Sequence, residues 1–399
     1  MQSPISITDN IHWIGVNDRE TFLFENLWPL EDGVSYNSYV VNDEKTALID
    51  TVKMNKADDY LYKIKQAIGD RQIDYLIVNH MEPDHSGLIA SILKDNPDLT
   101  VVGNKTTEKF IEQFYAVKPT FQAIKDGDTI DLGSTTLTFY HTPMVHWPET
   151  IMTYEQKSGV LFSGDAFGGF GTLDGGVFDD EVNIDFYENE IRRYFSNIVG
   201  KYSPMVQNAI KKLQANGVQP RVIAPTHGII WRDDPSIIVA LYDRWSRYEV
   251  KNGAVIVYGS MYGNTERMAD MIGRSLSSYG IRDIRIYDAS RTHNSHLIND
   301  IWQYKATIIG SCTYNQGLFP PIQGLMDKIE DRRIKNHVFG VFGTYAWSGG
   351  GVKKIMDYMD RNKWELIDEP VEALCSPSNE DFDRCDRLAK KLADTLQQS

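Results

Sequence analysis

Residues Tyr75 to Asn79 read YLIVN, and the next six, His80 to His85, read HMEPDH. The apolar run with its β-branched residues predicts a buried strand. A strand end that opens into a loop lets several side chains converge on one point without disturbing the core. Because this loop carries imidazole and carboxylate groups, we expect a metal site at the end of the strand.

Three further segments end in a side chain that can bind a metal. His146 follows the TLTFYHTPMV run, Asp165 ends VLFSG, and His227 ends RVIAPT. The full candidate set of metal ligands, which is also the candidate catalytic centre, is His80, Glu82, Asp84, His85, His146, Asp165 and His227. Two divalent metals carry four positive charges, and the three carboxylates offset three of them. A set without thiolate suits iron, manganese or zinc, and a bridging carboxylate is usual between two metals.

The chain has two unlike halves. Up to about residue 248 many short β-type runs follow one another, with helical patterns between some of them, which favours a mixed sheet layered with helices. After the polar stretch 247–253 strand and helix alternate. Expected strands lie at 253–259, 283–288, 305–311, 337–344 and 364–373, and expected helices at 264–280, 296–304, 321–331 and 352–361, with another closing the chain. We therefore predict two domains, residues 1–250 and 251–399, the second a doubly wound parallel sheet of flavodoxin type.

Three loops of the second half follow the first, third and fourth expected strands, where flavodoxin-like sheets bind FMN. The first loop is rich in hydroxyl groups and backbone N–H groups at a helix N-terminus, which predicts an anion site. It lacks the Walker lysine and the GxGxxG pattern, so one phosphate fits better than a triphosphate or a dinucleotide. The candidate FMN-binding residues are Ser260, Met261, Tyr262, Gly263, Asn264, Thr265, Thr313, Tyr314, Asn315, Gly317, Gly343, Tyr345, Trp347, Ser348 and Gly349.

The pattern HxExDH followed by single His, Asp and His resembles the metallo-β-lactamase-like domain of flavodiiron proteins, also called A-type flavoproteins. Hydrolytic members of that superfamily usually carry HxHxDH and bind zinc, whereas Glu82 makes this site harder and more anionic. The flavin loops also look like those of the family, except that Cys312 stands where many members have proline. The resemblance covers nearly the whole chain and implies an αββα sandwich followed by a flavodoxin-like domain.

Carried over by position, the resemblance implies one iron bound by His80, Glu82 and His146 and a second bound by Asp84, His85 and His227, with Asp165 bridging. His85 is not a ligand in every family member. The implied cofactors are FMN and a non-haem diiron centre. Some members place a histidine beside the substrate pocket near the N-terminus, but here residues 24–28 read FENLW, which leaves the preference between dioxygen and nitric oxide open.

The implied activity is reduction of dioxygen to water, of nitric oxide to nitrous oxide, or of both, with electrons from FMN. The expected partners are an external electron donor, such as rubredoxin or a reductase, and further copies of the chain in a head-to-tail homodimer or a dimer of dimers. Two alternatives remain: a zinc hydrolase with a flavodoxin module, and an FMN electron-transfer protein with an inert metal site.

The composition limits the classes of partner and the cellular location that we expect. The formal net charge of −14 argues against nucleic acid and anionic membranes as partners. No apolar run is long enough to span a bilayer, and the start of the chain does not read as a signal peptide. The three cysteines form no CxxC pair, so no disulfide framework or cysteine-bound cluster is expected, and a cytoplasmic location is the default.

Overall fold

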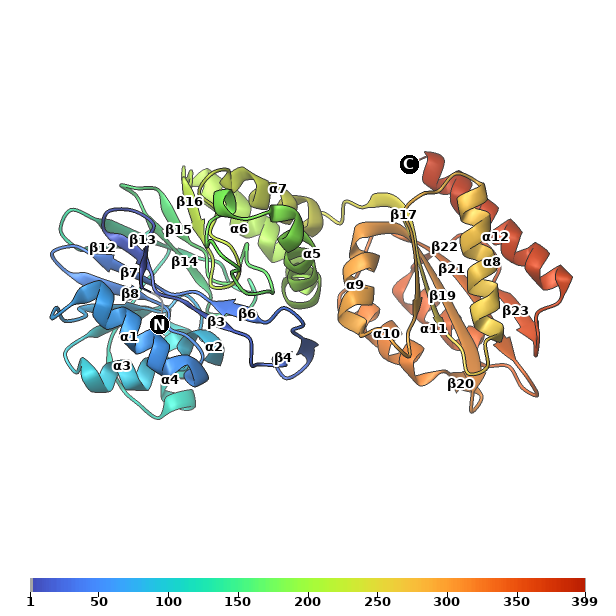
Figure 1. Cartoon of the computed structure of the whole chain (residues 1–399), viewed down its shortest axis with the longest axis horizontal. Coiled ribbons are helices and arrows are strands. Elements are labelled where there is room, and N and C mark those ends of the chain that lie inside the picture. Colours follow the sequence, from blue (N-terminus) through green and yellow to red (C-terminus); the bar gives the residue numbers. More distant parts are fainter. Residues whose placement is uncertain (1–2, 399) are drawn as a thin grey trace. The chain divides into compact units, whose positions relative to one another are not determined.

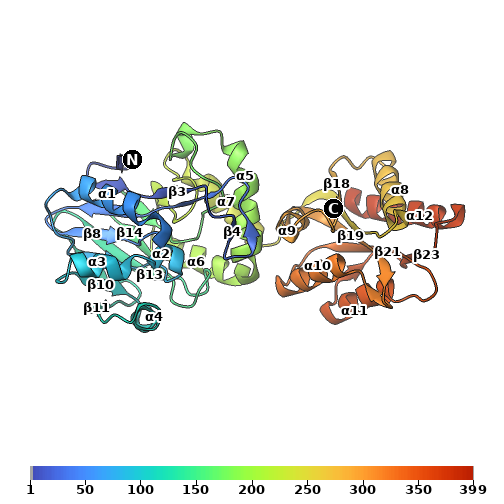
Figure 2. The ribbon, with the colours of Figure 1, turned by 60° about the horizontal axis from the view of Figure 1, so that its bottom comes forward.

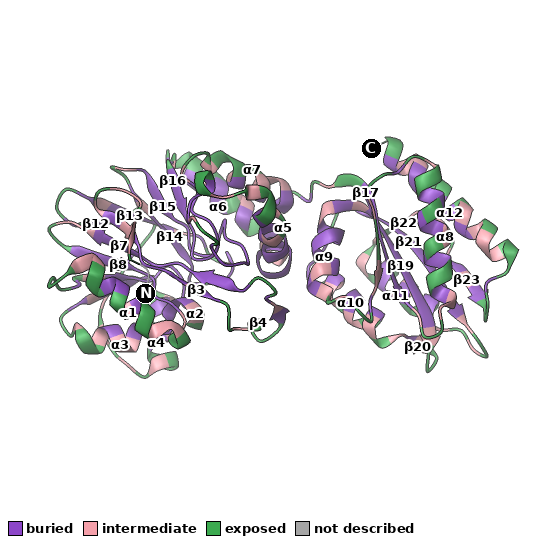
Figure 3. Ribbon diagram, in the orientation of Figure 1, coloured by how far each residue is buried: buried purple, intermediate pink, exposed green. Residues whose placement is uncertain are grey.

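The computed structural model describes residues 3–398. The chain divides into two compact units, residues 1–246 and 247–399, and each is described by itself. In both units most strands are buried while the helices expose their outer faces (Figure 3). Within the described residues no helix is long and apolar enough to cross a membrane.

The first unit contains two large sheets. The first sheet has the strand order β1 (Ile5–Ser6), β2 (Ile11–Trp13), β7 (Tyr39–Asn42), β8 (Thr46–Ile49), β9 (Tyr75–Ile77), β10 (Thr100–Gly103) and β11 (Thr120–Ala123). The second has the order β12 (Thr129–Asp131), β13 (Thr136–His141), β14 (Ile151–Glu155), β15 (Val160–Phe162) and β16 (Val222–Ala224). Two short pairs accompany them: β3 (Val16–Asp18) with β6 (Val34–Tyr36), and β4 (Leu23–Phe24) with β5 (Trp28–Pro29).

Helices cover this pair of sheets on both sides (Figure 1). They are α1 (Ala57–Ile68), α2 (Pro83–Ser86), α3 (Ile89–Asp95), α4 (Lys105–Tyr115), α5 (Ile184–Tyr194), α6 (Ser203–Ala215) and α7 (Pro235–Ser246), with the short turns η1 (Met54–Lys56), η2 (Asp179–Glu181), η3 (Phe195–Val199) and η4 (Gly200–Tyr202). Helices α1, α3 and α4 lie on one side, and α6 and α7 on the other. This is the αββα sandwich that the resemblance implied.

The strand directions explain where the metal-binding loops meet. Strands β8, β9 and β10 run parallel to one another, as do β15 and β16. Parallel neighbours end at the same edge of a sheet, so the loop after β15 and the loop after β16 emerge side by side. The α2 turn begins at Pro83 directly after the β9 loop, and its fixed φ suits the first position of a helix.

The second unit is built on one mainly parallel sheet. Its strands are β18 (Ile284–Asp288), β17 (Lys251–Gly259), β19 (Tyr304–Tyr314), β21 (Val338–Tyr345) and β22 (Glu365–Leu366) in spatial order, with β20 (Gly317–Leu318) beside β19 and β23 (Val371–Leu374) beside β21. Its helices are α8 (Asn264–Ser278), α9 (Asn294–Gln303), α10 (Pro320–Asp331), α11 (Gly351–Asn362) and α12 (Asn379–Gln398). Helices α8 and α12 cover one face, and α10 and α11 the other (Figure 2). The predicted flavodoxin-like sheet is confirmed.

The single strand expected at residues 364–373 was wrong. The segment forms two short strands, β22 and β23, that pair with different parts of β21. Pro370 lies between them, and proline has no N–H for a ladder hydrogen bond, so the run is interrupted there.

Candidate metal centre and flavin pocket

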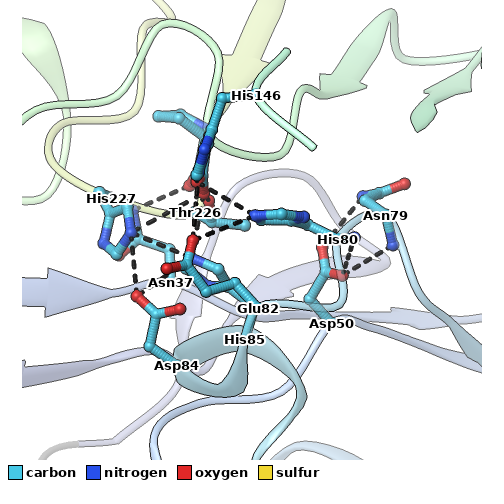
Figure 4. Close-up of polar contacts among 12 residues, drawn as sticks. Asn37, Asp50, Asn79, His80, Glu82, Asp84, His85, His146, Thr226 and His227 are labelled. Carbon is cyan, nitrogen blue, oxygen red and sulfur yellow. Dashed lines mark hydrogen bonds and ion pairs between the residues drawn. The ribbon is translucent and has the colours of Figure 1, made fainter. Parts of the chain in front are cut away.

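The structure brings all seven candidate metal ligands together in the first unit, on loops that follow strands and on the α2 turn; Figure 4 labels all of them except Asp165. They form two groups within which the donor atoms lie no more than 4.8 Å apart. The first group is His80, Glu82, His146 and Asp165, and the second is Asp84, His85 and His227. All seven side chains are buried or nearly so, which is unusual for charged groups unless they are paired or bind metal.

In the first group, two imidazoles face two carboxylates. His146 Nε2 lies 2.9 Å from Asp165 Oδ2 and 3.1 Å from Glu82 Oε2. His80 Nε2 lies 3.3 Å from the same Glu82 oxygen and 3.5 Å from the same Asp165 oxygen. Four donor atoms therefore point at one place.

In the second group, the Nε2 atoms of His85 and His227 lie 3.0 Å apart, and each lies 3.4 Å from Asp84 Oδ2. Asp165 reaches this group with its other oxygen, because Oδ1 lies 3.0 Å from His85 Nε2 and 3.8 Å from His227 Nε2. One carboxylate thus presents Oδ2 to the first group and Oδ1 to the second, as a bridging ligand does.

The donor set fits metal cations better than it fits an internal hydrogen-bond network. Both carboxylate oxygens of Asp84 are buried without a hydrogen-bond partner, as is His85 Nδ1. Unpaired buried polar atoms are costly, and two imidazole nitrogens facing each other cannot satisfy one another unless one is protonated. Imidazole and carboxylate donors without thiolate suit iron, manganese or zinc.

Other side chains orient the candidate ligands. Glu149 is fully buried, and its Oε1 lies 2.9 Å from His80 Nδ1 and accepts the Met81 backbone N–H at 2.9 Å. His227 Nδ1 donates to the Ser35 carbonyl at 2.8 Å. Each contact places the ring proton on Nδ1 and leaves Nε2 free to bind a metal.

Asp50 holds the loop that follows β9. Its carboxylate accepts the Asn79 backbone N–H at 2.8 Å, the Asn79 side-chain amide at 3.1 Å and the His80 backbone N–H at 3.3 Å. Burial raises the pKa of Asp50 to about 6. His85 and these hydrogen bonds act in the opposite direction and lower that pKa, but burial outweighs them. The sequence analysis did not single out Asp50 or Glu149. For Asp50 one signal was available, because it ends the apolar run TALID much as Asp165 ends VLFSGD.

The centre is strongly anionic. Burial alone would lower the pKa of His85 and His146, but neighbouring carboxylates outweigh it and raise both to about 9. Burial would conversely raise the pKa of Asp165, yet the surrounding imidazoles hold it well below its usual range. In the metal-free protein these histidines therefore carry protons that a metal must displace, so metal affinity falls as the pH decreases.

A cavity of about 610 Å³ opens over the centre. Glu82 and Asp84 form part of its lining, together with Tyr36 and Lys53. The β4–β5 hairpin forms another wall, and Glu25 and Asn26 at its turn have φ of +50° and +55°, as a tight hairpin turn requires.

Glu25 approaches the centre from this hairpin. Partial burial and the nearby Glu82 carboxylate raise the pKa of Glu25 to about 7. Trp28 Nε1 donates to Glu25 Oε2 at 2.9 Å and holds the carboxyl in place. The hairpin therefore brings a further carboxyl group to the metal centre.

The second unit has a pocket between the loops that follow β17, β19 and β21. Its lining includes nine of the candidate FMN-binding residues: Ser260, Met261, Tyr262, Asn264, Thr313, Asn315, Tyr345, Trp347 and Ser348. Cys312, Gln316, Thr344, Ala346 and Cys375 also line it and were not among the candidates. Cys375 follows β23, a strand that the sequence analysis did not separate from β22.

Six candidates do not line the pocket: Gly263, Thr265, Tyr314, Gly317, Gly343 and Gly349. Some of these shape the loops instead. Gly263 has φ of +84° and donates its N–H to Ser260 Oγ at 3.0 Å. The Thr265 and Thr344 hydroxyls lie 2.9 Å apart, and a Cβ on Gly343 would come within 2.4 Å of the Ser311 carbonyl oxygen.

Known proteins match both units and the whole chain. Residues 34–228 match the family described as "ODP family beta lactamase", and residues 256–369 match flavodoxin. The nitric oxide reductase of Moorella thermoacetica is 33% identical over 98% of this chain and 99% of its own length. The chain belongs to the flavodiiron protein family.

Solved structures of flavodiiron proteins agree with this assignment. Rubredoxin oxygen:oxidoreductase from Desulfovibrio gigas superposes with a TM-score of 0.95 at 31% identity, over 99% of both chains. The flavodiiron protein from Giardia intestinalis gives a TM-score of 0.94 at 25% identity, over 99% of this chain and 97% of its own. The predicted family, fold and oxidoreductase class are therefore confirmed.

Proposed function

We propose that this flavodiiron protein reduces dioxygen to water, nitric oxide to nitrous oxide, or both, at two iron ions that receive electrons from FMN. The observation that carries the proposal is Asp165, whose two carboxylate oxygens face two separate groups of donors at 2.9 and 3.0 Å. Relatives named nitric oxide reductase and rubredoxin-oxygen oxidoreductase, each over 30% identical along nearly the full length, support it.

The proposed assignment of ligands follows the two groups. His80, Glu82 and His146 would hold one iron, Asp84, His85 and His227 the other, and Asp165 would bridge them. Diferrous iron and reduced FMN together supply up to four electrons, the number that dioxygen needs to become water. The proposal includes His85 because its Nε2 points at Asp84, His227 and Asp165.

Other residues of the chain would bind FMN and orient the metal ligands. We assign the diiron site to the domain at residues 1–250 and the FMN site to the domain at residues 251–399. Hydroxyl and amide groups of Ser260, Thr313 and Asn315 can hydrogen-bond the polar parts of FMN, and Trp347 and Tyr345 offer flat faces to its ring. In the first domain Tyr36 lines the cavity and places its ring edge-on to His227, which limits the water beside that ligand.

Stopped-flow oxidation of the fully reduced protein by each gas tests the proposal, with iron and FMN quantified in the same sample. We expect reoxidation much faster than that of free reduced FMN, and four electrons consumed per dioxygen without release of peroxide. Reoxidation at the rate of free flavin would instead indicate an inert metal site. Zinc in the native protein together with thioester hydrolysis would indicate the hydrolase.

We further propose a head-to-tail homodimer, alone or as a dimer of dimers, in which the FMN of one protomer serves the metal centre of another. Large apolar side chains are exposed beside both pockets, including Phe22 and Met54 in the first unit and Trp347 and Tyr262 in the second. Exposed apolar clusters of this kind mark contact surfaces. A demonstrably monomeric form that keeps full turnover would contradict the dimer.

We also propose an external electron donor such as rubredoxin or a reductase, because FMN must be reduced again after each turnover. Its three cysteines are all free, which agrees with a reducing compartment such as the cytoplasm. Reduction of the bound flavin by purified rubredoxin with its reductase tests the donor, and no reduction by rubredoxin or by a flavin reductase would exclude both classes.

A further inference from the structure

Trp147 touches two proposed ligands of the same iron. Its ring lies edge-on to His80 with 5.2 Å between ring centroids, and edge-on to His146 with 6.3 Å. Both imidazoles belong to the first group of donors, so this indole is next to one end of the metal centre.

Two phenylalanine rings of α4 continue from Trp147 toward solvent. Phe110 lies edge-on to the indole at 6.1 Å, and Phe114 is stacked on it at 6.4 Å with an interplanar angle of 24°. Phe114 is 49% exposed and lies 6.0 Å from the ring of Tyr115. A line of rings thus leads from two proposed ligands through Trp147 to the protein surface.

Core packing does not explain this line of rings. The α4 helix buries Thr107 and Ile111 against the sheet, while Phe114 stays outside that contact. The rings around the second group differ. Phe24, Tyr36 and Tyr194 also face His227, but all three are at most 3% exposed. Among the described residues, the aromatic rings that extend from a proposed ligand to an exposed ring are therefore those beside the first group.

We propose that Trp147 is a redox relay that supplies an electron when dioxygen meets a centre that is not fully reduced. The inference rests on the proposed function. Reduction of one dioxygen to two water molecules takes four electrons and four protons. In a chain that lacks one electron, the indole of Trp147 gives up that electron and releases its N–H proton to water. A thiol or ascorbate at the exposed Phe114 then returns one electron to the indole radical, and the indole nitrogen takes back a proton from water.

The relay protects the ligands. An oxidising equivalent that stays at the centre attacks the nearest oxidisable groups, which are the histidines themselves. Indole is easier to oxidise than imidazole. The radical stays on Trp147, because phenyl rings are harder to oxidise than indole, and Phe110 and Phe114 only span the short distance between the indole and reductants in solution. The relay is idle when all four electrons are present, because no electron is then missing.

The test uses the holoenzyme with ring-deuterated tryptophan. One sample carries about three of the four electrons per chain, the other all four, and both are mixed with dioxygen and freeze-quenched for EPR spectroscopy. We expect an organic radical whose lines narrow with the deuterated label in the partly reduced sample and not in the fully reduced one. The flavin semiquinone does not respond to this label, so the two radicals are distinguished. Ascorbate in the buffer is expected to shorten the life of the labelled radical.

Three variants decide between the relay and other sources of the radical. Trp147→Phe is expected to lose the labelled signal, and Trp147→Tyr to replace it with a tyrosyl signal, which keeps the test valid if the Phe variant loads no iron. Trp364→Phe is the matched control, because that indole only stacks on Phe339 in the second unit, and it is expected to keep both the signal and dioxygen uptake. A labelled radical that persists in Trp147→Phe or Trp147→Tyr overturns the relay.

The failure of the relay and the failure of the function look different. If the wild-type protein consumes dioxygen normally but gives no labelled radical in the partly reduced sample, the relay is wrong and the function stands. If the reduced protein consumes no dioxygen, both the proposed function and the relay are wrong.

Discussion

The metal centre of the first unit and the pocket of the second differ in how they are built. The seven candidate ligands are packed inside the fold. His80 and His227 face Glu149 and the Ser35 carbonyl, which accept their hydrogen bonds, and the Thr226 hydroxyl donates to Asp165. The pocket of the second unit is made of surface loops, and Trp347 and Tyr262 beside it are 86% and 88% exposed. Charge differs as well: residues 1–246 carry 21 basic and 35 acidic side chains, whereas residues 247–399 carry 20 of each.

The difference follows from what each site must bind. Metal ions require charged donors that are in place before binding. The first unit therefore holds buried groups of like charge close together, which is costly in free energy, and the bound ions offset that cost. FMN is large and brings its own flat ring and polar groups, so loops that adapt to it suffice. We therefore expect metal to govern the stability of the first unit, and FMN to affect only the second.

Removing the metal ions with a chelator is expected to have the largest effect. A ligand that binds only the folded state stabilises it by about 4 kcal/mol at a thousand times its Kd, so the first unit should lose at least that much. Differential scanning calorimetry should show one of two transitions moving to lower temperature and returning when ferrous iron is restored anaerobically. Equal shifts of both transitions would show that the units are not independent in this respect.

Glu149→Gln is expected to weaken metal binding about 10- to 100-fold, because the amide orients His80 without the negative charge that strengthens it as a ligand. Glu155→Gln is the matched control. Glu155 is equally buried but accepts the backbone N–H groups of Lys157 and Ser158, away from the centre. Competition with a chromophoric chelator measures both affinities. Similar losses in the two variants would mean that general destabilisation, and not His80, is responsible.

The substitutions Asp18→Asn and Glu330→Gln together compare a buried carboxylate with an exposed one. Despite burial, the Thr21 hydroxyl and the backbone N–H groups of Glu20 and Thr21 hold the pKa of Asp18 well below its usual range. A depressed carboxyl pKa adds stability that is present above the ordinary value and lost as the pH falls below about 4. We expect the variant to lose about 2 kcal/mol at pH 7 and to have a weaker loss of stability in acid.

Glu330→Gln in the second unit removes the exposed carboxylate. The Arg361 guanidinium lowers the pKa of Glu330 to about 2, but the pair is open to solvent. Solvent screening limits such pairs to less than about 1 kcal/mol. Urea unfolding of each variant at pH 7 and pH 3 gives both values. A larger effect for Glu330 than for Asp18 would contradict the difference between the units.

Trp347→Ala is expected to weaken FMN binding about tenfold, because one aromatic contact contributes about 1 kcal/mol or a little more. Quenching of FMN fluorescence by the FMN-depleted protein measures the affinity. The iron content should not change, since Trp347 belongs to the second unit. A parallel loss of iron would show that the flavin loops support the metal centre.

The two sites also differ in what the sequence could predict. The seven candidate ligands were predictable because each is a distinctive side chain at the end of an apolar run, and the motif HMEPDH supplies four of them within six residues. The flavin loops were predictable in position but not residue by residue. Gly343 and Thr265 support the loops rather than line the pocket, which depends on how strands pack and not on residue type.

Long-range contacts account for what the sequence did not reveal. Glu149 lies 69 residues from His80 along the chain, and no local pattern marks their pairing. Glu25 comes near Glu82 because of a hairpin whose strands have only two residues each, too few to show alternation. The break between β22 and β23 was signalled by Pro370, but the run of β-type residues around it suggested one strand.

The central claim is that one carboxylate, Asp165, joins two groups of donors into a site for a pair of irons. Mössbauer spectroscopy of the native protein enriched in the iron isotope tests this most directly. The account predicts two iron ions per chain that are spin-coupled, with a diamagnetic ground state when both are ferric. A single isolated ferric ion per chain, with no coupling, would contradict it.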